Sequence, residues 1–256
     1  MSPHLPFPAE RIAVVSITRH GIALAGHVVT ALPGARLFAP EKFAAEAEAA
    51  AAGAATCYAG KTAEQIPILL SRFDGIVAIV SLGAMVRLLA PHLGKKESDP
   101  GVVVIDEAGR FVIPMLSGHL GGANALAGGI AGALDATAVL TNAADARQTL
   151  AVDLLGRELG WAFEASHDEI VRASAAMVND EPVALVQEAG SPDWWRGHAN
   201  GRSGPLPANL HPFSRLEDVD IDRFGAVLWV SHRALPAGLA ASLAGKRVIY
   251  RPPVTA

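Results

Sequence analysis

The sequence has 256 residues but only one cysteine, Cys57, and aromatic residues make up just 5% of it. A single cysteine excludes an internal disulfide framework and a cysteine-based zinc site. The longest apolar run, 75–90, contains Arg87, and it falls short of the roughly 18–20 uninterrupted residues of a membrane helix. Residues 1–11 lack the apolar core of a signal peptide. These absences predict a cytoplasmic protein.

Charge is also scarce. Charged residues make up 18% of the sequence and the formal net charge is −4, so no global positive field is available for nonspecific binding of nucleic acid. The histidines outside the segments discussed below show no metal-ligand spacing, and no metal site is expected. Hydrophobic residues make up 51% of the chain, which is enough for a substantial core.

Short β-branched runs alternate with Ala-rich segments of helical periodicity, and this alternation predicts an α/β fold. A polar break at 141–148 suggests two α/β units, 1–143 and 144–256, the first a mostly parallel sheet flanked by helices. We expect strands at 12–18, 36–39, 75–80, 102–106, 109–115, 138–141, 183–187, 224–231 and 247–250, helices at 21–32, 41–52, 62–72, 82–93, 118–134, 150–160 and 167–179, and a long surface loop at 191–212.

The segment 116–126, L-S-G-H-L-G-G-A-N-A-L, is the densest polar segment of the chain. Its glycines allow a ligand to approach the backbone, and a helix start offers free amides and a positive dipole end to an anion. Ser117 and His119 add polar and acid–base chemistry. The segment lacks the G-x-G-x-x-G, P-loop and G-x-S-x-G patterns. A plain structural turn is the alternative interpretation.

A second polar block, 86–106, precedes this segment and includes Arg87, Lys95 and Asp99. An arginine in an apolar helix requires an anionic partner, because an unpaired buried charge is unfavourable. That partner is either a substrate carboxylate, which the guanidinium fork matches, or an internal carboxylate such as Asp99 or Asp106. The two blocks together suggest one anion-binding site.

Two further polar groups follow predicted strands. Asp106 and Glu107 end one of them, and a carboxylate at the carboxyl end of a parallel strand often faces the ligand crevice. Glu107 is therefore a candidate general base, with a strand-end turn as the equal alternative. Thr141 follows another strand and is expected at the same sheet edge, where it either hydrogen-bonds a substrate or caps a helix.

Three motifs, V-R-x-x-A-P, K-x-x-D-P-x-V-V-V-x-D-E-x-G and L-S-G-H-x-G-G-A-N, occur in this order between 86 and 124. The combined run closely resembles the CbiG family, the cobalt-precorrin-5A hydrolases of anaerobic cobalamin biosynthesis. The resemblance is strongest over 75–153 and weaker elsewhere. It implies an N-terminal-type domain followed by a central-region-type domain, and relatives are expected to carry a further C-terminal domain.

The resemblance implies opening of the δ-lactone of cobalt-precorrin-5A and release of acetaldehyde, which gives cobalt-precorrin-5B. The substrate itself carries the cobalt, so no separate cofactor is expected. His119 and Glu107 are the expected catalytic residues. The expected substrate-binding residues are Arg87, Lys95, Asp99, Ser117, Gly118, Gly121, Gly122, Asn124 and Thr141.

Two other functions stay open from the sequence. The first is a non-catalytic corrinoid-binding subunit that works with a separately encoded C-terminal domain or with other enzymes of the cobalamin pathway. The second is a nucleotide-binding α/β module, which the absence of phosphate-binding patterns disfavours. Neither nucleic acid nor a membrane is an expected partner.

Overall fold

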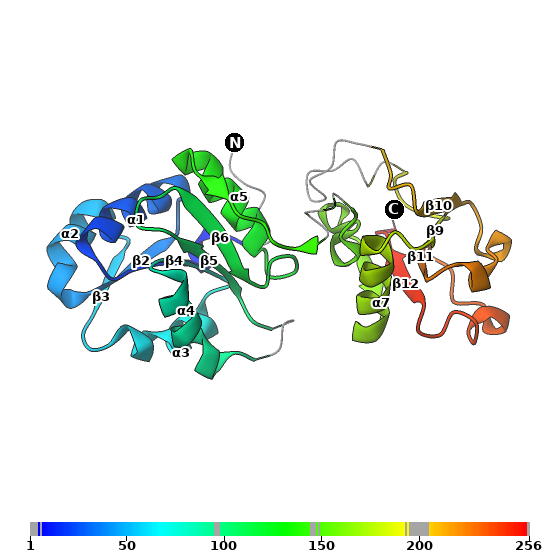
Figure 1. The fold of residues 1–256 in the computed structure, drawn as a ribbon, viewed down its shortest axis with the longest axis horizontal. Coiled ribbons are helices and arrows are strands. Elements are labelled where there is room, and N and C mark those ends of the chain that lie inside the picture. Colours follow the sequence, from blue (N-terminus) through cyan, green and yellow to red (C-terminus); the bar gives the residue numbers. More distant parts are fainter. Residues whose placement is uncertain are drawn as a thin grey trace. The chain divides into compact units, whose positions relative to one another are not determined.

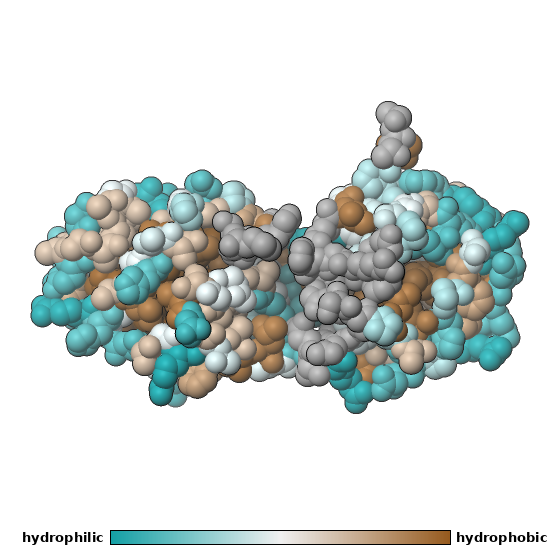
Figure 2. All heavy atoms as spheres, turned by 90° about the horizontal axis from the view of Figure 1, so that it is seen from above, coloured by the Kyte–Doolittle hydropathy of each residue, from teal (hydrophilic) through white to brown (hydrophobic). Residues whose placement is uncertain are grey.

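The computed structural model describes residues 5, 7–94, 98–143, 147, 149–192, 194 and 205–254. The chain forms two compact units, Met1–Leu140 and Thr141–Ala256, so the division falls after Leu140, whereas the sequence suggested a boundary after residue 143. Figure 2 shows hydrophobic side chains scattered among hydrophilic ones on the face in view. Among the described residues, no helix is long and apolar enough to cross a membrane.

The first unit is built on a seven-stranded sheet with the strand order β3-β2-β1-β4-β5-β6-β7 (Figure 1). The strands from β1 to β5 pair in parallel, β6 runs antiparallel to β5, and β7 runs parallel to β6. This confirms the predicted α/β class and its mostly parallel sheet. The strands are β1 (Ile12–Ser16), β2 (Arg36–Pro40), β3 (Ala55–Tyr58), β4 (Gly75–Ile79), β5 (Gly101–Ile105), β6 (Phe111–Leu116) and β7 (Thr137–Ala138).

Helices cover both faces of this sheet. Helices α1 (Arg19–Ala31), α2 (Ala44–Ala50) and α5 (Ala123–Leu134) pack on one face, and α3 (Thr62–Arg72) and α4 (Leu82–Leu89) pack on the other (Figure 1). All residues of β1, β4 and β5 are buried, which explains why these strands are continuous β-branched and aliphatic runs rather than alternating ones. Three short 3₁₀ turns complete the unit: η1 (Ala9–Arg11), η2 (Glu41–Phe43) and η3 (Ala90–His92).

The strand directions define two edges of the first sheet. The carboxyl edge is where β1, β4 and β5 end, at Ser16, Ile79 and Ile105, and the amino edge is where these strands begin. Because β6 runs in the opposite direction, it starts at the carboxyl edge and ends at the amino edge at Leu116. The segment that follows Leu116 therefore lies at the amino edge.

The second unit has a five-stranded sheet with the order β10-β9-β11-β12-β8, in which only β8 is antiparallel to its neighbour. Helix α7 (His167–Val178) packs against it, and Trp229 and Tyr250 are its largest fully buried side chains. Its strands are β8 (Ala162–Glu164), β9 (Val183–Gln187), β10 (Leu210–Phe213), β11 (Ala226–Val230) and β12 (Arg247–Arg251), and its 3₁₀ turns are η4 (Val152–Leu154), η5 (Arg157–Leu159), η8 (Leu216–Asp218), η9 (Ile221–Arg223) and η10 (Ala237–Leu239).

Two predicted helices differ from the structure. Helix α5 begins at Ala123 rather than 118, because the preceding glycine-rich segment folds as a loop. The helix predicted at 150–160 is instead a pair of 3₁₀ turns, η4 and η5. Gly156 between them has a φ of +73°, and a methyl group there would come within 2.3 Å of the Trp161 ring. The backbone therefore turns against the indole instead of continuing as a helix. Strand β10 lies partly within the predicted loop 191–212.

The contact between Gly156 and Trp161 gives a stability prediction. We expect Gly156→Ala to lower the free energy of unfolding of the second unit by about 2–4 kcal/mol, through left-handed strain and overpacking. Gly245 is the matched control, because it has the same φ of +73° but nothing within 4 Å of the added methyl. Gly245→Ala should lower that free energy by only about 1 kcal/mol. Equal losses in urea unfolding would contradict the role of the indole contact.

Candidate functional site

The loop 117–122 joins the end of β6 to α5 at the amino edge of the first sheet. It lies directly against the start of β5: a methyl group on Gly101 would come within 2.2 Å of the Gly121 carbonyl oxygen. Within the loop, a methyl group on Gly121 would come within 2.3 Å of Ser117 Cβ. Glycines are needed at both positions because the backbones touch.

The loop uses its own carbonyl groups to satisfy the start of α5. The amide of Ala123 donates to the Ser117 oxygen at 3.3 Å, Asn124 N donates to the Gly118 oxygen at 2.9 Å, and Gly122 N donates to the His119 oxygen at 2.9 Å. The sequence predicted that the amides of this loop and helix start would be free to hold a carboxylate. In this conformation the Gly122 amide and the first two helical amides are occupied by carbonyl oxygens of the loop and are not free.

Single polar atoms of Ser117, His119 and Asn124 are shielded from solvent. Ser117 has a φ of +53°, a left-handed conformation that residues other than glycine rarely adopt. Ser117 is only 9% exposed, and its Oγ has no hydrogen-bond partner among the described residues. The Nε2 of His119 and the Oδ1 of Asn124 are also shielded from solvent. The loop and the first turn of α5 thus each hold polar atoms that are shielded from solvent.

Arg87 pairs with neither of the internal carboxylates that the sequence suggested, Asp99 and Asp106. It lies exposed on α4, where a guanidinium nitrogen donates to the Gly83 carbonyl of the same helix at 2.8 Å. Asp99, two residues before Gly101, instead accepts bonds from the Gly94 amide at 3.1 and 3.2 Å. Asp106 pairs with Arg110 at 3.5 Å. The prediction of an internal salt bridge for Arg87 is therefore wrong, and its guanidinium is exposed where a ligand could reach it.

Asp106 and Glu107 lie at the carboxyl edge. Asp106 accepts bonds from the amides of Arg110 and Phe111 at 2.8 and 2.7 Å. Burial alone would raise the pKa of Asp106, but the hydrogen bonds from Phe111 and Arg110 and the charge of Arg110 hold that pKa below its ordinary value. Glu107 accepts a short hydrogen bond from the hydroxyl of Thr18.

Glu107 and His119 therefore lie at opposite edges of the sheet. Strand β5 has five residues, and at about 3.3 Å per residue its first and last Cα atoms are about 13 Å apart. His119 and Glu107, the two catalytic residues expected from the sequence, therefore do not lie side by side. The physical reason is the reversal of β6, which returns the chain to the amino edge before the loop begins.

For two remaining predicted residues, Lys95 and Thr141, the described part of the chain gives no contact with the loop. Lys95 lies outside the described residues. Thr141 was expected at the edge that carries Asp106, but β7 runs parallel to β6 and so leaves the sheet in the direction of the amino edge. Thr141 itself is the first residue of the second unit.

Sequence reasoning missed Thr18, which lies at the carboxyl edge between β1 and β4. The connections after these two strands pass to opposite faces of the sheet, the position at which open α/β sheets commonly bind ligands. Thr18 caps α1 by accepting a bond from Gly21 N at 3.1 Å, and it also binds Glu107. A threonine three residues before a glycine, directly after a strand, was the available signal.

Sequence reasoning also missed Glu188, which follows β9 in the second unit. Its carboxylate accepts bonds from Leu216 N at 3.0 Å, Trp229 Nε1 at 2.9 Å, Ser231 Oγ at 2.8 Å and Arg233 at 2.9 Å. Burial alone would raise its pKa, but these hydrogen bonds and the charge of Arg233 hold the pKa below its ordinary value. The signal was the same as for Asp106, a carboxylate directly after a buried strand.

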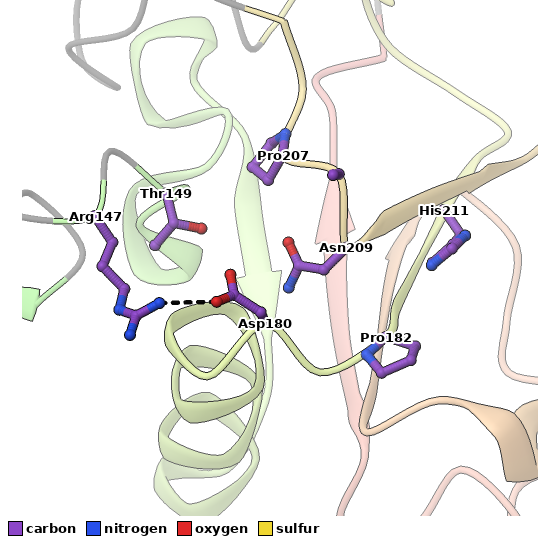
Figure 3. Close-up of a pocket in the computed structure, with 8 residues that line it drawn as sticks. Arg147, Thr149, Asp180, Pro182, Pro207, Asn209 and His211 are labelled. Atoms are coloured by element: carbon purple, nitrogen blue, oxygen red, sulfur yellow. Dashed lines mark hydrogen bonds and ion pairs between the residues drawn. The ribbon is translucent and has the colours of Figure 1, made fainter.

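A cavity of about 670 Å³ lies at the start of β9 and β10 in the second unit (Figure 3). Arg147 and Asp180 form an ion pair at 2.8 Å across part of it. Asn209 donates to the Glu181 carbonyl at 2.9 Å, and Thr149 donates to the Met177 carbonyl at 3.5 Å. These hydrogen bonds stabilise the C-terminal end of α7 and the residues that follow it. The lining residues are Arg147, Thr149, Asp180, Pro182, Pro207, Ala208, Asn209 and His211.

Among the described residues, no group of three or more His, Cys, Asp or Glu could hold a metal ion.

Each of the two units matches the model of a known protein family. The model of the cobalamin synthesis G N-terminal region matches residues 64–145, and the model of the cobalamin biosynthesis central region matches residues 150–252. The chain belongs to the CbiG family. The first CbiG match contains the loop 117–122, and the second covers nearly the whole second unit.

Two curated relatives extend this similarity. The cobalt-precorrin-5A hydrolase of Priestia megaterium is 38% identical over 244 residues, which are 95% of this chain and 63% of that protein. The cobalt-precorrin-5A hydrolase of Salmonella typhimurium is 32% identical over 225 residues, which are 88% of this chain and 59% of that protein. The chain thus spans about three-fifths of the length of these CbiG relatives.

A solved structure of a cobalamin biosynthesis protein G homolog from Sulfolobus solfataricus also aligns with the chain. The TM-score is 0.49 at 18% sequence identity, with 96% of this chain and 61% of that chain covered.

The Glu188 cluster predicts a pH-dependent stability of the central region of this CbiG protein. Because its folded pKa is lowered, Glu188 stabilises the unit above its unfolded pKa of about 4.3, and this stabilisation is lost as the pH falls through the folded pKa. We expect Glu188→Gln to lower the free energy of unfolding by about 2–3 kcal/mol at pH 7. The difference in free energy of unfolding between Glu188→Gln and the wild type should become smaller below about pH 4.

The control for Glu188 is Glu217, whose pKa is lowered to about 2, chiefly by its side-chain hydrogen bond to Arg233. Glu217 is solvent-exposed, so Glu217→Gln should change stability much less. Urea unfolding between pH 3 and 7 measures both variants. A loss that stays constant down to pH 3 would show that Glu188 acts through shape rather than charge.

Proposed function

We propose that this chain hydrolyses the δ-lactone of cobalt-precorrin-5A and releases acetaldehyde, which gives cobalt-precorrin-5B in anaerobic cobalamin biosynthesis. The supporting observation is 38% identity to a cobalt-precorrin-5A hydrolase across 95% of the chain, together with the loop 117–122 and the start of α5, where polar atoms of Ser117, His119 and Asn124 are shielded from solvent. The reaction takes place in the cytoplasm and needs no cofactor besides the cobalt in the substrate.

The proposed reaction has two steps. Water adds to the lactone carbonyl, and the acyl carbon–oxygen bond breaks to give a carboxylate and an alcohol. A base then removes the alcohol proton, and the adjacent carbon–carbon bond breaks as the oxygen becomes the aldehyde carbonyl. The bonding electron pair passes to the conjugated macrocycle, which takes up a proton. Both steps need a group that accepts and returns protons and a donor that stabilises an oxyanion.

His119 is the proton-transferring group in this proposal. It lies in the loop 117–122, close in sequence to Asn124 at the start of α5, whose side-chain amide can donate a hydrogen bond to the lactone oxygen. Glu107 lies at the opposite edge of the sheet, so it has no part in proton transfer at this loop. Of the remaining predicted residues, Arg87 on α4 and Lys95 hold acidic arms of the macrocycle, because their cations pair with carboxylates.

Substitution of His119 tests the assignment. We expect His119→Ala to lower kcat for acetaldehyde release by about 10²–10⁴-fold, the usual contribution of a positioned acid–base group. His27→Ala is the matched control, because His27 is an exposed histidine of α1 in the same unit. Its turnover should equal that of the wild type, and circular dichroism should show that both variants fold. A His119→Ala enzyme within tenfold of wild-type kcat would refute the role.

The variant Glu107→Ala tests which edge of the sheet carries the chemistry. If the chemistry takes place at the amino edge, this variant should retain far more acetaldehyde release than His119→Ala. Equal losses in kcat would instead place the reacting atoms near Thr18 and Glu107. A wild-type chain that binds cobalt-precorrin-5A tightly but yields no acetaldehyde would refute the hydrolase function and leave a corrinoid-binding subunit.

A further inference from the structure

The start of α5 is blocked by the loop itself, although a helix of this length would otherwise offer an anion site. Helix α5 has 12 residues, and its dipole favours negative charge at the first turn. The carbonyl oxygens of Ser117 and Gly118 occupy the amides of Ala123 and Asn124, and the His119 oxygen occupies the amide of Gly122. The loop therefore places neutral oxygens where an anion would bind more strongly.

Two unfavourable features accompany this arrangement, and both lie in Ser117. Its backbone has a φ of +53°, which is strained for a residue with a side chain. Its hydroxyl is buried and has no partner among the described residues, so it has lost its bonds to water without replacement. The side chain packs inside the loop, since its Cβ is 2.3 Å from where a methyl group on Gly121 would lie. Opening the loop would relieve both features.

We propose that the loop 117–122 is a latch that exchanges its own carbonyl oxygens for a carboxylate of the ligand. In the closed form described here, the amides of Gly122, Ala123 and Asn124 bind the loop. In the open form these amides bind a carboxylate, and Ser117 regains hydrogen bonds. Ser117 is thus a positioning residue that destabilises the closed form. The identity of the carboxylate as an acidic arm of a macrocycle rests on the function proposed above.

A charged ligand is required for this exchange. A carboxylate carries a full charge and two oxygens, whereas each loop carbonyl offers only a partial charge, so the carboxylate forms stronger hydrogen bonds with the same amides. The helix dipole adds to this preference. A neutral ester or amide arm lacks the charge and would not displace the loop. The latch therefore selects acids over their uncharged derivatives.

Hydrogen exchange of the three amides tests the latch without any substrate. Ser117→Gly removes both the strain and the buried hydroxyl, so the closed form should become more populated, and exchange of Gly122, Ala123 and Asn124 should slow about tenfold. Ser117→Ala removes the hydroxyl but leaves a side chain in the left-handed region, so we expect a smaller slowing. Unchanged exchange in Ser117→Gly would overturn the proposal.

Asp135 supplies the matched control. It has a φ of +54° at the other end of the same helix, so Asp135→Gly relieves the same kind of strain away from the loop. Both glycine variants should raise the melting temperature by a few degrees, but only Ser117→Gly should slow exchange at the three amides. Equal slowing in both variants would show a general stabilisation of the unit and would overturn the latch.

Citrate is the ligand probe, because it is a small polycarboxylate. Titration of citrate should shift the amide NMR signals of Gly122, Ala123 and Asn124, with about tenfold weaker binding to Ser117→Gly than to the wild type or Asp135→Gly. The trimethyl ester of citric acid should cause no shift. Absence of a shift with citrate, or an equal shift with the ester, would overturn the proposal.

The turnover assay keeps the two proposals apart. With cobalt-precorrin-5A, Ser117→Gly should raise KM for acetaldehyde release about tenfold and change kcat less, because the closed form competes with binding. If the wild type releases no acetaldehyde but citrate shifts the three amides, the hydrolase function fails and the latch stands. If the wild type is active but Ser117→Gly has a wild-type KM and exchange rate, the latch fails alone.

Discussion

The reversal of β6 against five parallel strands determines at which edge of the first sheet the glycine-rich polar loop lies. If the chain had crossed over to a sixth parallel strand, the glycine loop would have joined Thr18 and Glu107 at the carboxyl edge. Instead β6 pairs antiparallel with β5, and the loop returns to the amino edge beside Gly101. The unit thus has Thr18 and Glu107 at its carboxyl edge and its glycine-rich polar loop at the other edge. That separation depends on one antiparallel pairing.

Much of the fold follows from local pattern. The buried strands at Gly75–Ile79 and Gly101–Ile105 were predicted nearly to the residue, because only strands covered on both faces combine β-branched continuity with this short length. The helix expected at 150–160 could not be excluded from sequence, since its loss depends on the contact between Gly156 and Trp161. The loop residues were also identified correctly as an unusual cluster. Whether Glu107 joins them depends on strand direction, which hydrophobic pattern does not encode.

Arg87 and Glu188 show that a charged side chain's partners are hard to predict from sequence. Arg87 was expected to pair with a carboxylate, either of a substrate or of the chain itself, yet it lies exposed and bonds a carbonyl of its own helix, so the apolar sequence around it did not report its burial. Glu188 looked unremarkable in sequence but collects bonds from Leu216, Trp229, Ser231 and Arg233. Those partners are at least 28 residues away, and such long-range convergence is visible only in three dimensions.

The contact between Gly101 and Gly121 limits how this sequence can change. A substitution in a packed core is often repaired by a smaller residue at the position that it crowds. Here a methyl group on Gly101 would meet the Gly121 carbonyl oxygen at 2.2 Å, and glycine is already the smallest residue, so no smaller residue at position 121 could relieve this contact. Recovery from a side chain at Gly101 would require the backbone of the loop itself to move. Gly101 is therefore a position at which mutational paths end.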